Sequence, residues 1–285
     1  MLVRALAIAL CLASSSVPAY AVTPAVAPLE AAESMTVEEL MTATALDQIF
    51  NTFAETIASS PEAQGVPVPA HFLRAWKQTA NEVFQPDQLH GALATELRNK
   101  FSEAELAELA TFFRDDFGMR ITAIENDVQQ LSAEDQLAAR DEGISLIEDM
   151  DATSRRSGQL DEIMTLVSAE VGRAMLGQAM RAMLMSMAVS GGAGDIEVPW
   201  EEIDAQLEQI LPGLEAEITM TQRAIMAYAY KDLADDELEQ YLQFLRTDAS
   251  QKFYAVLGLS VGRIMESTMS RFGEELAHRL NQVNV

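Results

Sequence analysis

The chain has 285 residues, and 44 acidic residues against 19 basic ones give it a formal net charge of -25. Such a surface repels phosphate backbones and anionic bilayers, so we expect no nucleic-acid partner. The acidity has two interpretations, solubility in an exported compartment or an acidic docking face. The only cysteine is Cys11, so beyond it thiolate catalysis, iron–sulfur clusters and thiol-bound zinc are excluded.

Residues 1–21 have the pattern of an export signal. Arg4 supplies an early positive charge, an apolar run covers residues 5–13, and Ala19-Tyr20-Ala21 is the small-x-small sequence that signal peptidase cleaves. The apolar run is far shorter than the roughly 20 residues of a bilayer-spanning helix. We therefore predict cleavage after Ala21, a periplasmic protein, and no transmembrane span in the mature chain.

The rest of the chain has the apolar spacing of helices. Residues 22–34 lack this period and are predicted to be a flexible lead-in. From Thr36 onward apolar residues recur by threes and fours, without the alternation typical of strands, so the predicted fold is an all-α helical bundle. Turn residues predict loops at 59–69, 85–87 and 190–199, with softer breaks at 155–158 and 211–213.

One helical pattern occurs twice, at residues 101–118 and again 132 positions later at 233–250. In the first copy an apolar stripe continues from Leu106 to Leu131, which predicts one long amphipathic helix. Ser102 and Glu105 have the spacing of a capping box at its start. In the second copy we expect Asp232 or Asp235 to cap the helix.

The two copies share identities in register. The signature residues are Phe112 and Arg114 in the first copy and Phe244 and Arg246 in the second. Further echoes keep the same order: EELMT at 38–42 with DEIMT at 161–165, and Trp76 with Trp200. We predict two pseudo-repeated multi-helix units, residues 35–156 and 157–285, with the signature residues in equivalent places. The alternative is that two amphipathic helices look alike by chance.

Each signature arginine follows the apolar stripe by one position. Its stem can cover the edge of the core while its guanidinium reaches a carboxylate at the boundary. We therefore expect Arg114 and Arg246 to make a shared type of structural pairing, with a shared ligand site as the alternative.

The repeated stretch resembles a family of small bacterial exported proteins grouped as domain of unknown function 2059. The resemblance lies in a serine cap, a Glu-Leu pair, an aromatic pair and a glycine, followed by a basic residue. In the first copy these are Ser102, Glu105, Leu106, Phe112, Phe113, Gly118 and Arg120; in the second, Glu237, Leu238, Phe244, Leu245 and Lys252 match and Ser250 replaces the glycine. The resemblance implies a helical, exported protein and lends no catalytic residue.

Metal-binding and phosphate-binding motifs are absent from the sequence. His71, His90 and His278 stand singly, without a second ligand at metal-binding spacing, and are predicted to be surface residues. The sequence has no zinc-protease motif and no phosphate-binding glycine loop. We therefore predict no catalytic residue, no metal site and no cofactor.

A methionine-rich stretch at residues 174–189 is the candidate groove. Met180, Met183 and Met187 share one helical face. Methionine fills irregular cores, lines adaptable binding surfaces and can bind Cu(I), so helix packing, a lipid or peptide groove and a copper site are the three interpretations.

Two function classes follow. The first is a non-enzymatic, exported interaction module that binds a protein segment or an apolar ligand between its helices. The alternative is an enzyme with a cryptic carboxylate-based site. The sequence leaves the oligomeric state open.

Overall fold

The computed structural model describes residues 34–63, 69–167 and 200–283, and these stretches contain helices and no strand. The prediction of an all-α bundle is confirmed. The helices are α2 (Val37–Ala43), α3 (Leu46–Ala63), α4 (Ala70–Val83), α5 (Pro86–Lys100), α6 (Glu103–Phe113), α7 (Asp116–Gln129), α8 (Ala133–Glu148), α9 (Arg155–Val167), α11 (Trp200–Ala229), α12 (Asp235–Leu245) and α13 (Asp248–Val283).

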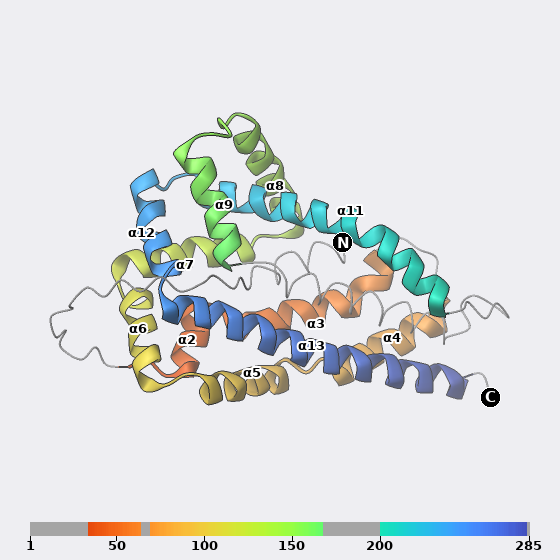
Figure 1. Cartoon of the computed structure of the whole chain (residues 1–285). Coiled ribbons are helices and arrows are strands. Elements are labelled where there is room, and N and C mark those ends of the chain that lie inside the picture. Colours follow the sequence, from red (N-terminus) through yellow and green to blue (C-terminus); the bar gives the residue numbers. More distant parts are fainter. Residues whose placement is uncertain (1–33, 64–68, 168–199, 284–285) are drawn as a thin grey trace.

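The helices form two groups that meet at one end of the molecule (Figure 1). In one group the long α13 packs along α4 and α5, and α3 packs on the same two helices. In the other, α11 packs on α8 and α9. Helices α6, α7 and α12 lie at the end where the groups meet, so they position the site described below.

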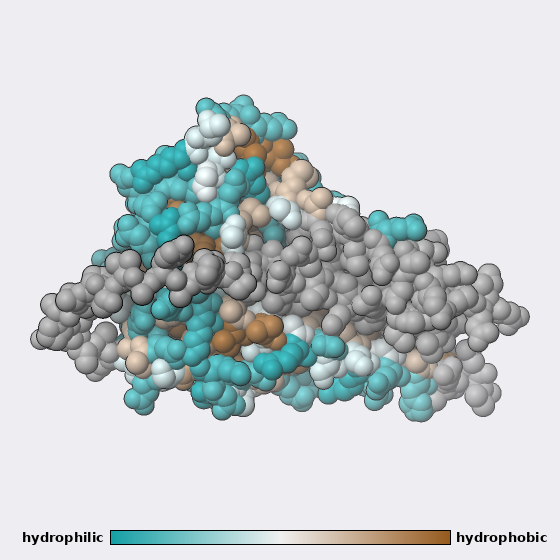
Figure 2. Space-filling view, viewed as in Figure 1, coloured by the Kyte–Doolittle hydropathy of each residue, from teal (hydrophilic) through white to brown (hydrophobic). Residues whose placement is uncertain are grey.

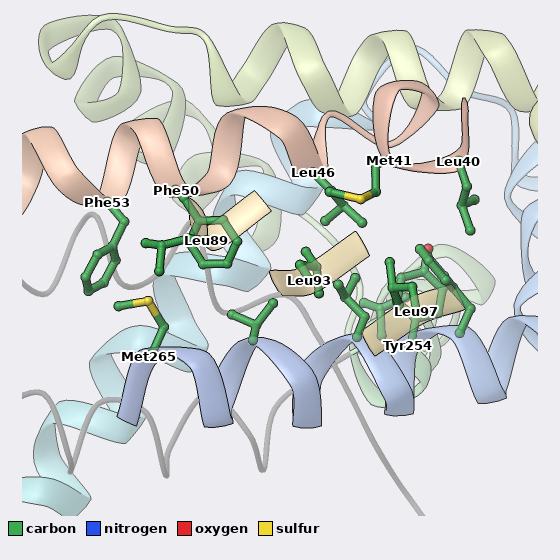
Figure 3. Packing of buried hydrophobic residues seen from close by; sticks show 14 of the residues in the cluster. Leu40, Met41, Leu46, Phe50, Phe53, Leu89, Leu93, Leu97, Tyr254 and Met265 are labelled. Carbon is green, nitrogen blue, oxygen red and sulfur yellow. The ribbon is translucent and has the colours of Figure 1, made fainter. Parts of the chain in front are cut away.

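The main core lies between α3, α5 and α13. Figure 3 shows Phe50 and Phe53 of α3, leucines of α5 and Met265 of α13 pointing toward one another. Leu93 and Leu97 of α5 are 0% exposed, as the three-to-four spacing of that helix predicts. Full burial of one such side chain stabilises the fold by roughly 1.5–3 kcal/mol. Packing of this kind stabilises the chain in place of disulfides.

Trp76 fastens α4 to its neighbours. Its indole N–H donates to the carbonyl oxygen of Ile57 in α3 at 2.6 Å, and its ring meets Phe272 of α13 edge-on at 4.8 Å. Trp76 lies in the middle of α4, whereas Trp200 is the first residue of α11. The two tryptophans therefore occupy different positions in their helices, and this echo does not support equivalence.

The helix starts are capped in two ways. The Ser102 hydroxyl accepts the N–H of Glu105, whose carboxylate accepts the N–H of Ser102, which completes the predicted capping box. The second copy corrects our expectation. Neither Asp232 nor Asp235 caps α12; Ala234 occupies the cap position, and Glu237 accepts its backbone N–H at 2.8 Å. An alanine side chain offers no acceptor, so only half of the box remains.

The predicted long helix is interrupted in each copy. Arg114 ends α6, and Asp115 takes an extended conformation (φ -74°, ψ 148°) while its carboxylate accepts the N–H of Phe117. In the second copy Arg246 ends α12, and the Thr247 hydroxyl accepts the N–H of Ser250. The apolar spacing continues across the break because both helices bury the same side. Periodicity alone therefore hides the corner.

Three predicted loops also need correction. Helix α3 extends through residues 59–63, α9 begins at Arg155, and α11 continues through 211–213. The break near α9 lies instead at residues 149–154. Where helical apolar spacing continues on both sides, isolated turn residues are weak signals because tertiary packing overrides them.

Candidate functional site

The corner between α6 and α7 meets the corner between α12 and α13 through a stacked aromatic pair. The rings of Phe112 and Phe244 are parallel within 4°, with centroids 3.7 Å apart, and both side chains are half-buried. Tyr241 extends the stack, 5.8 Å from Phe112. The two signature phenylalanines are therefore partners of each other.

Two ion pairs cross this contact in opposite directions. Arg120 of α7 binds Glu237 of α12, and Lys252 of α13 binds Glu105 of α6 with Nζ 2.6 Å from Oε1. Arg120 and Lys252 are 132 residues apart, as are Glu105 and Glu237. Reciprocal pairing is the pattern of an interface between two copies of one surface. We call these four residues together with Phe112 and Phe244 the joint.

Each glutamate of the joint interacts both with a backbone N–H and with a basic side chain. Lys252 and, next in size, the backbone N–H of Ser102 lower the pKa of Glu105 to about 2. The backbone N–H of Ala234 and the Arg120 guanidinium lower the pKa of Glu237. Each carboxylate thus links the start of its own helix to a basic side chain from the other corner.

The signature arginines lie just outside the joint, and each binds a carboxylate. Arg114 Nη2 is 3.1 Å from Glu39 of α2. Arg246 binds Glu162 of α9 through two hydrogen bonds of 2.7 and 2.8 Å, and Glu239 at 2.7 Å. Glu39 and Glu162 are the second residues of EELMT and DEIMT. The upstream echo and the signature residues are therefore physically connected in both halves. The division at residue 157 stays a prediction, which these contacts support.

A carboxyl group and three tyrosines form a polar cluster beside the joint. Glu125 of α7 accepts hydrogen bonds at Oε1 from the hydroxyls of Tyr230 (2.5 Å) and Tyr241 (2.9 Å). The Tyr241 hydroxyl also lies 3.5 Å from that of Tyr254. Tyr230, Tyr241 and Tyr254 are 4%, 2% and 9% exposed. We call these four residues the tyrosine cluster.

Burial dominates the electrostatics of this cluster. Loss of hydration raises the pKa of Glu125, although the hydrogen bonds from Tyr230 and Tyr241 partly oppose this effect. Burial and then the nearby Glu125 raise the pKa of Tyr241 well above its ordinary value. The sequence does contain a signal for this site, because Glu125 follows the buried Ile121 by four residues and so lies on the apolar face of its helix.

The turn that carries Tyr230 is held from the other side by α9. Arg156 Nε binds Asp235 at 2.8 Å, and its other nitrogens donate to the carbonyl oxygens of Tyr230 and Leu233. Gln159 donates to the carbonyl oxygen of Asp235 at 2.8 Å. Residues 230–234 therefore lie between α9 and Glu125. Sequence analysis did not identify this arrangement.

The candidate groove residues Met180, Met183 and Met187 lie outside the described residues. Elsewhere, Met119 of α7, Met220 of α11 and Leu259 of α13 are exposed large apolar side chains at 49%, 54% and 62%. Figure 2 shows apolar surface over the first half of α13. Val256, one turn before Leu259, is half-buried and extends this face.

The histidines differ in their surroundings. His71 and His278 are exposed, as predicted, whereas His90 is half-buried with its ring 5.3 Å from that of Phe50, which corrects the expectation. Within the described ranges, no group of three or more His, Cys, Asp or Glu side chains is arranged to hold a metal ion.

No helix in the part of the chain that the structure describes is both long and apolar enough to cross a membrane.

The chain matches no protein-family model, and neither a curated protein nor a solved structure is detectably similar to it. The resemblance to domain of unknown function 2059 therefore stays a prediction.

Proposed function

We propose that the protein is an exported, periplasmic interaction module without a catalytic role, which binds an apolar segment of a basic polypeptide along α13. The observation that carries this proposal is the exposed Leu259, with the half-buried Val256 beside it, on a chain of net charge -25. An apolar side chain at 62% exposure on a strongly acidic protein favours a partner that is apolar in the middle and cationic at its ends.

The exposed leucine and the acidic surface contribute to binding in different ways. Burying a leucine side chain stabilises a complex by roughly 1.5–3 kcal/mol. The acidic surface accelerates the encounter with a cationic partner and disfavours anionic ones. Arg263, one turn after Leu259, is bound to Glu96 at 2.7 Å, so its charge is offset on this face.

The test uses two fluorescent peptides with one apolar core, flanked by lysines in one and by glutamates in the other. Anisotropy titrations with the full mature protein give each Kd at low and high salt. We expect the lysine-flanked peptide to bind more tightly, with affinity falling as salt screens the charges. Leu259→Ser should weaken this binding about tenfold or more, as loss of a buried leucine implies.

The control is Met220→Ser, which removes an exposed apolar side chain from α11. Equal effects of Leu259→Ser and Met220→Ser, or equal affinity for the two peptides, would contradict the proposal. A lipid that co-purifies with the wild-type protein and is lost from Leu259→Ser would instead identify an apolar small ligand, the other partner that the sequence suggests.

The second candidate is an enzyme with a carboxylate-based site, and Glu125 is the observation that favours it. A carboxyl group with a raised pKa has the property that a general acid needs. Both of its hydrogen bonds, however, go to buried tyrosine hydroxyls, which supports a role inside the fold. If the binding proposal holds, Glu125→Gln should leave the peptide Kd unchanged.

Export has a test of its own. When the full chain is produced in a Gram-negative host, we expect the protein in the periplasmic fraction with Val22 as its first residue. Retention of residues 1–21 on the recovered protein would contradict this part of the proposal.

A further inference from the structure

Glu125 joins three elements through one oxygen atom. Its Oε1 accepts a hydrogen bond from Tyr230, at the turn after α11, and another from Tyr241 of α12. Tyr241 in turn meets Tyr254 of α13. The carboxyl group therefore links α7 to the turn at residues 230–234 through a hydrogen bond from Tyr230.

Several basic side chains on the surrounding elements are engaged with other carboxylates. They include Arg120, Arg223, Lys231, Lys252 and Arg156, whose partners are Glu237, Asp161, Glu142, Glu105 and Asp235 respectively. The groups that contact the Glu125 carboxyl are the hydroxyls of Tyr230 and Tyr241, and Tyr254 lies behind Tyr241. Among the residues that the structure describes, no cation is paired with Glu125 to offset the loss of hydration of a negative charge at this place.

We propose that Glu125 is a proton-operated latch: the neutral carboxyl group holds α7 against the turn at residues 230–234, and ionisation opens this contact. A neutral carboxyl group is accommodated among tyrosine rings at little cost, and it can also donate a hydrogen bond. Glu125 is half-buried by accessible surface, and a carboxylate in this place recovers full hydration when the contact opens. The joint lies beside the latch, since Tyr241 stacks on Phe112.

The direction of the pH effect follows from linkage. The pKa of Glu125 is raised in the closed form, and in the open form it returns toward the ordinary 4.5. The closed form is therefore most favoured below pH 4.5, and this advantage is lost as the pH rises toward the raised pKa. Over that window the opening constant increases by up to about tenfold per pH unit, as for any single linked proton.

The test is hydrogen exchange of the full mature protein, measured by mass spectrometry from pH 5 to pH 8 and corrected for the intrinsic exchange rates. Protection of the peptide at residues 228–236 should fall with rising pH by up to about tenfold per unit. Protection of the α5 core should change far less. In Glu125→Gln, which is neutral at every pH, protection at 228–236 should not depend on pH.

The matched control is Glu108→Gln, an exposed glutamate on α6, which should behave as the wild type. The latch is refuted if wild-type protection at 228–236 is independent of pH, or if Glu125→Gln loses protection in parallel with the wild type. A second variant, Tyr241→Phe, removes one donor to the carboxylate and should extend the wild-type trend to higher pH.

A direct readout keeps the proposal testable if Glu125→Gln does not fold. Carbon-13 NMR of glutamate carboxyl groups in the wild type should show one group that titrates above the others. Tyr241→Phe should move that group further upward. Titration of every glutamate at or below the ordinary pKa would overturn the proposal.

Discussion

The corner between α6 and α7 and the corner between α12 and α13 are alike in the helix that leads into them. They differ in the helix that follows and in the side chains packed inside. Helices α6 and α12 both have 11 residues, and in each an arginine is the C-cap residue that follows the last helical residue. Beyond the corner α7 ends at Gln129 after 14 residues, whereas α13 continues for 36 residues to close the core over α4 and α5. The residues at the end of the first helix therefore set each corner, while the elements that the following helix covers set the length of that helix.

The interiors differ most at Gly118 and Ser250, which are 132 residues apart. A Cβ atom at residue 118 would lie 1.9 Å from the carbonyl oxygen of Phe112, so the first corner requires glycine. The second corner has room for a serine side chain, whose buried hydroxyl has no hydrogen-bond partner among the described residues. The first corner is therefore the more tightly closed of the two.

The largest expected effect concerns the buried residues after each corner, Ile121 and Phe253, both 1% exposed. Phe253→Ala should lower the free energy of unfolding by about 3–5 kcal/mol, and Ile121→Ala by a smaller amount within about 2–5 kcal/mol. Phe253 also loses ring contacts with Phe101 and Phe113, at 6.3 and 6.1 Å. Urea denaturation measures both. A larger loss for Ile121→Ala would place the main core at the first corner instead.

The next largest effect on stability concerns Gly118 and Ser250, the residues at which the two corners differ. Gly118→Ala should cost about 1–3 kcal/mol or more, because the added methyl group meets backbone that cannot move freely. Ser250→Ala should change stability by less than about 1 kcal/mol, since it removes a hydroxyl without a partner. The same denaturation experiment decides. Equal tolerance of both alanines would show that the first corner can open without cost.

A smaller effect measures the joint itself. In a double-mutant cycle of Phe112→Leu and Phe244→Leu, we expect a coupling energy of about 0.5–1.5 kcal/mol, the usual worth of a stacked aromatic pair. Phe112→Leu combined with Phe72→Leu, in α4, should be additive. Additivity in both cycles would mean that the stacked pair stabilises the fold only through the apolar area that each ring buries.

The smallest effect distinguishes the two arginines. Arg246 donates short hydrogen bonds of 2.7–2.8 Å to the carboxylates of Glu162 and Glu239, whereas the hydrogen bond from Arg114 to Glu39 is longer, at 3.1 Å. Both are surface pairs, so the effects are modest. We expect Arg246→Gln to lower the Tm by about 2 °C more than Arg114→Gln. High salt should reduce this difference; a larger loss for Arg114→Gln would contradict the ranking.

The sequence predicts which residues of the two copies correspond, but it does not predict that these residues contact each other. The 132-residue offset identifies Phe112 with Phe244 and Arg114 with Arg246, because it records which side of each helix is apolar. It does not indicate that the two phenylalanines stack on each other. That contact depends on how distant helices are arranged, which no local spacing encodes.

Two features of the structure were not predicted from the sequence, and the reasons are opposite. The corner at Asp115 was hidden because apolar residues continue across it in helical register. Glu125 was overlooked because a chain with 44 acidic residues makes any one glutamate look like surface. Its place four residues after Ile121 was the available signal.

The joint also has a consequence for the order in which the chain is made. Phe112 stacks on Phe244 and Glu105 binds Lys252, and each of these two partners follows more than 130 residues later in the chain. At roughly 5–20 residues per second of synthesis, the first half waits on the order of ten seconds with its half of the joint uncovered. Two unfinished chains can meet during that time. Because the halves pair reciprocally, we expect misassembly by domain swapping, in which the second half of each chain packs on the first half of the other.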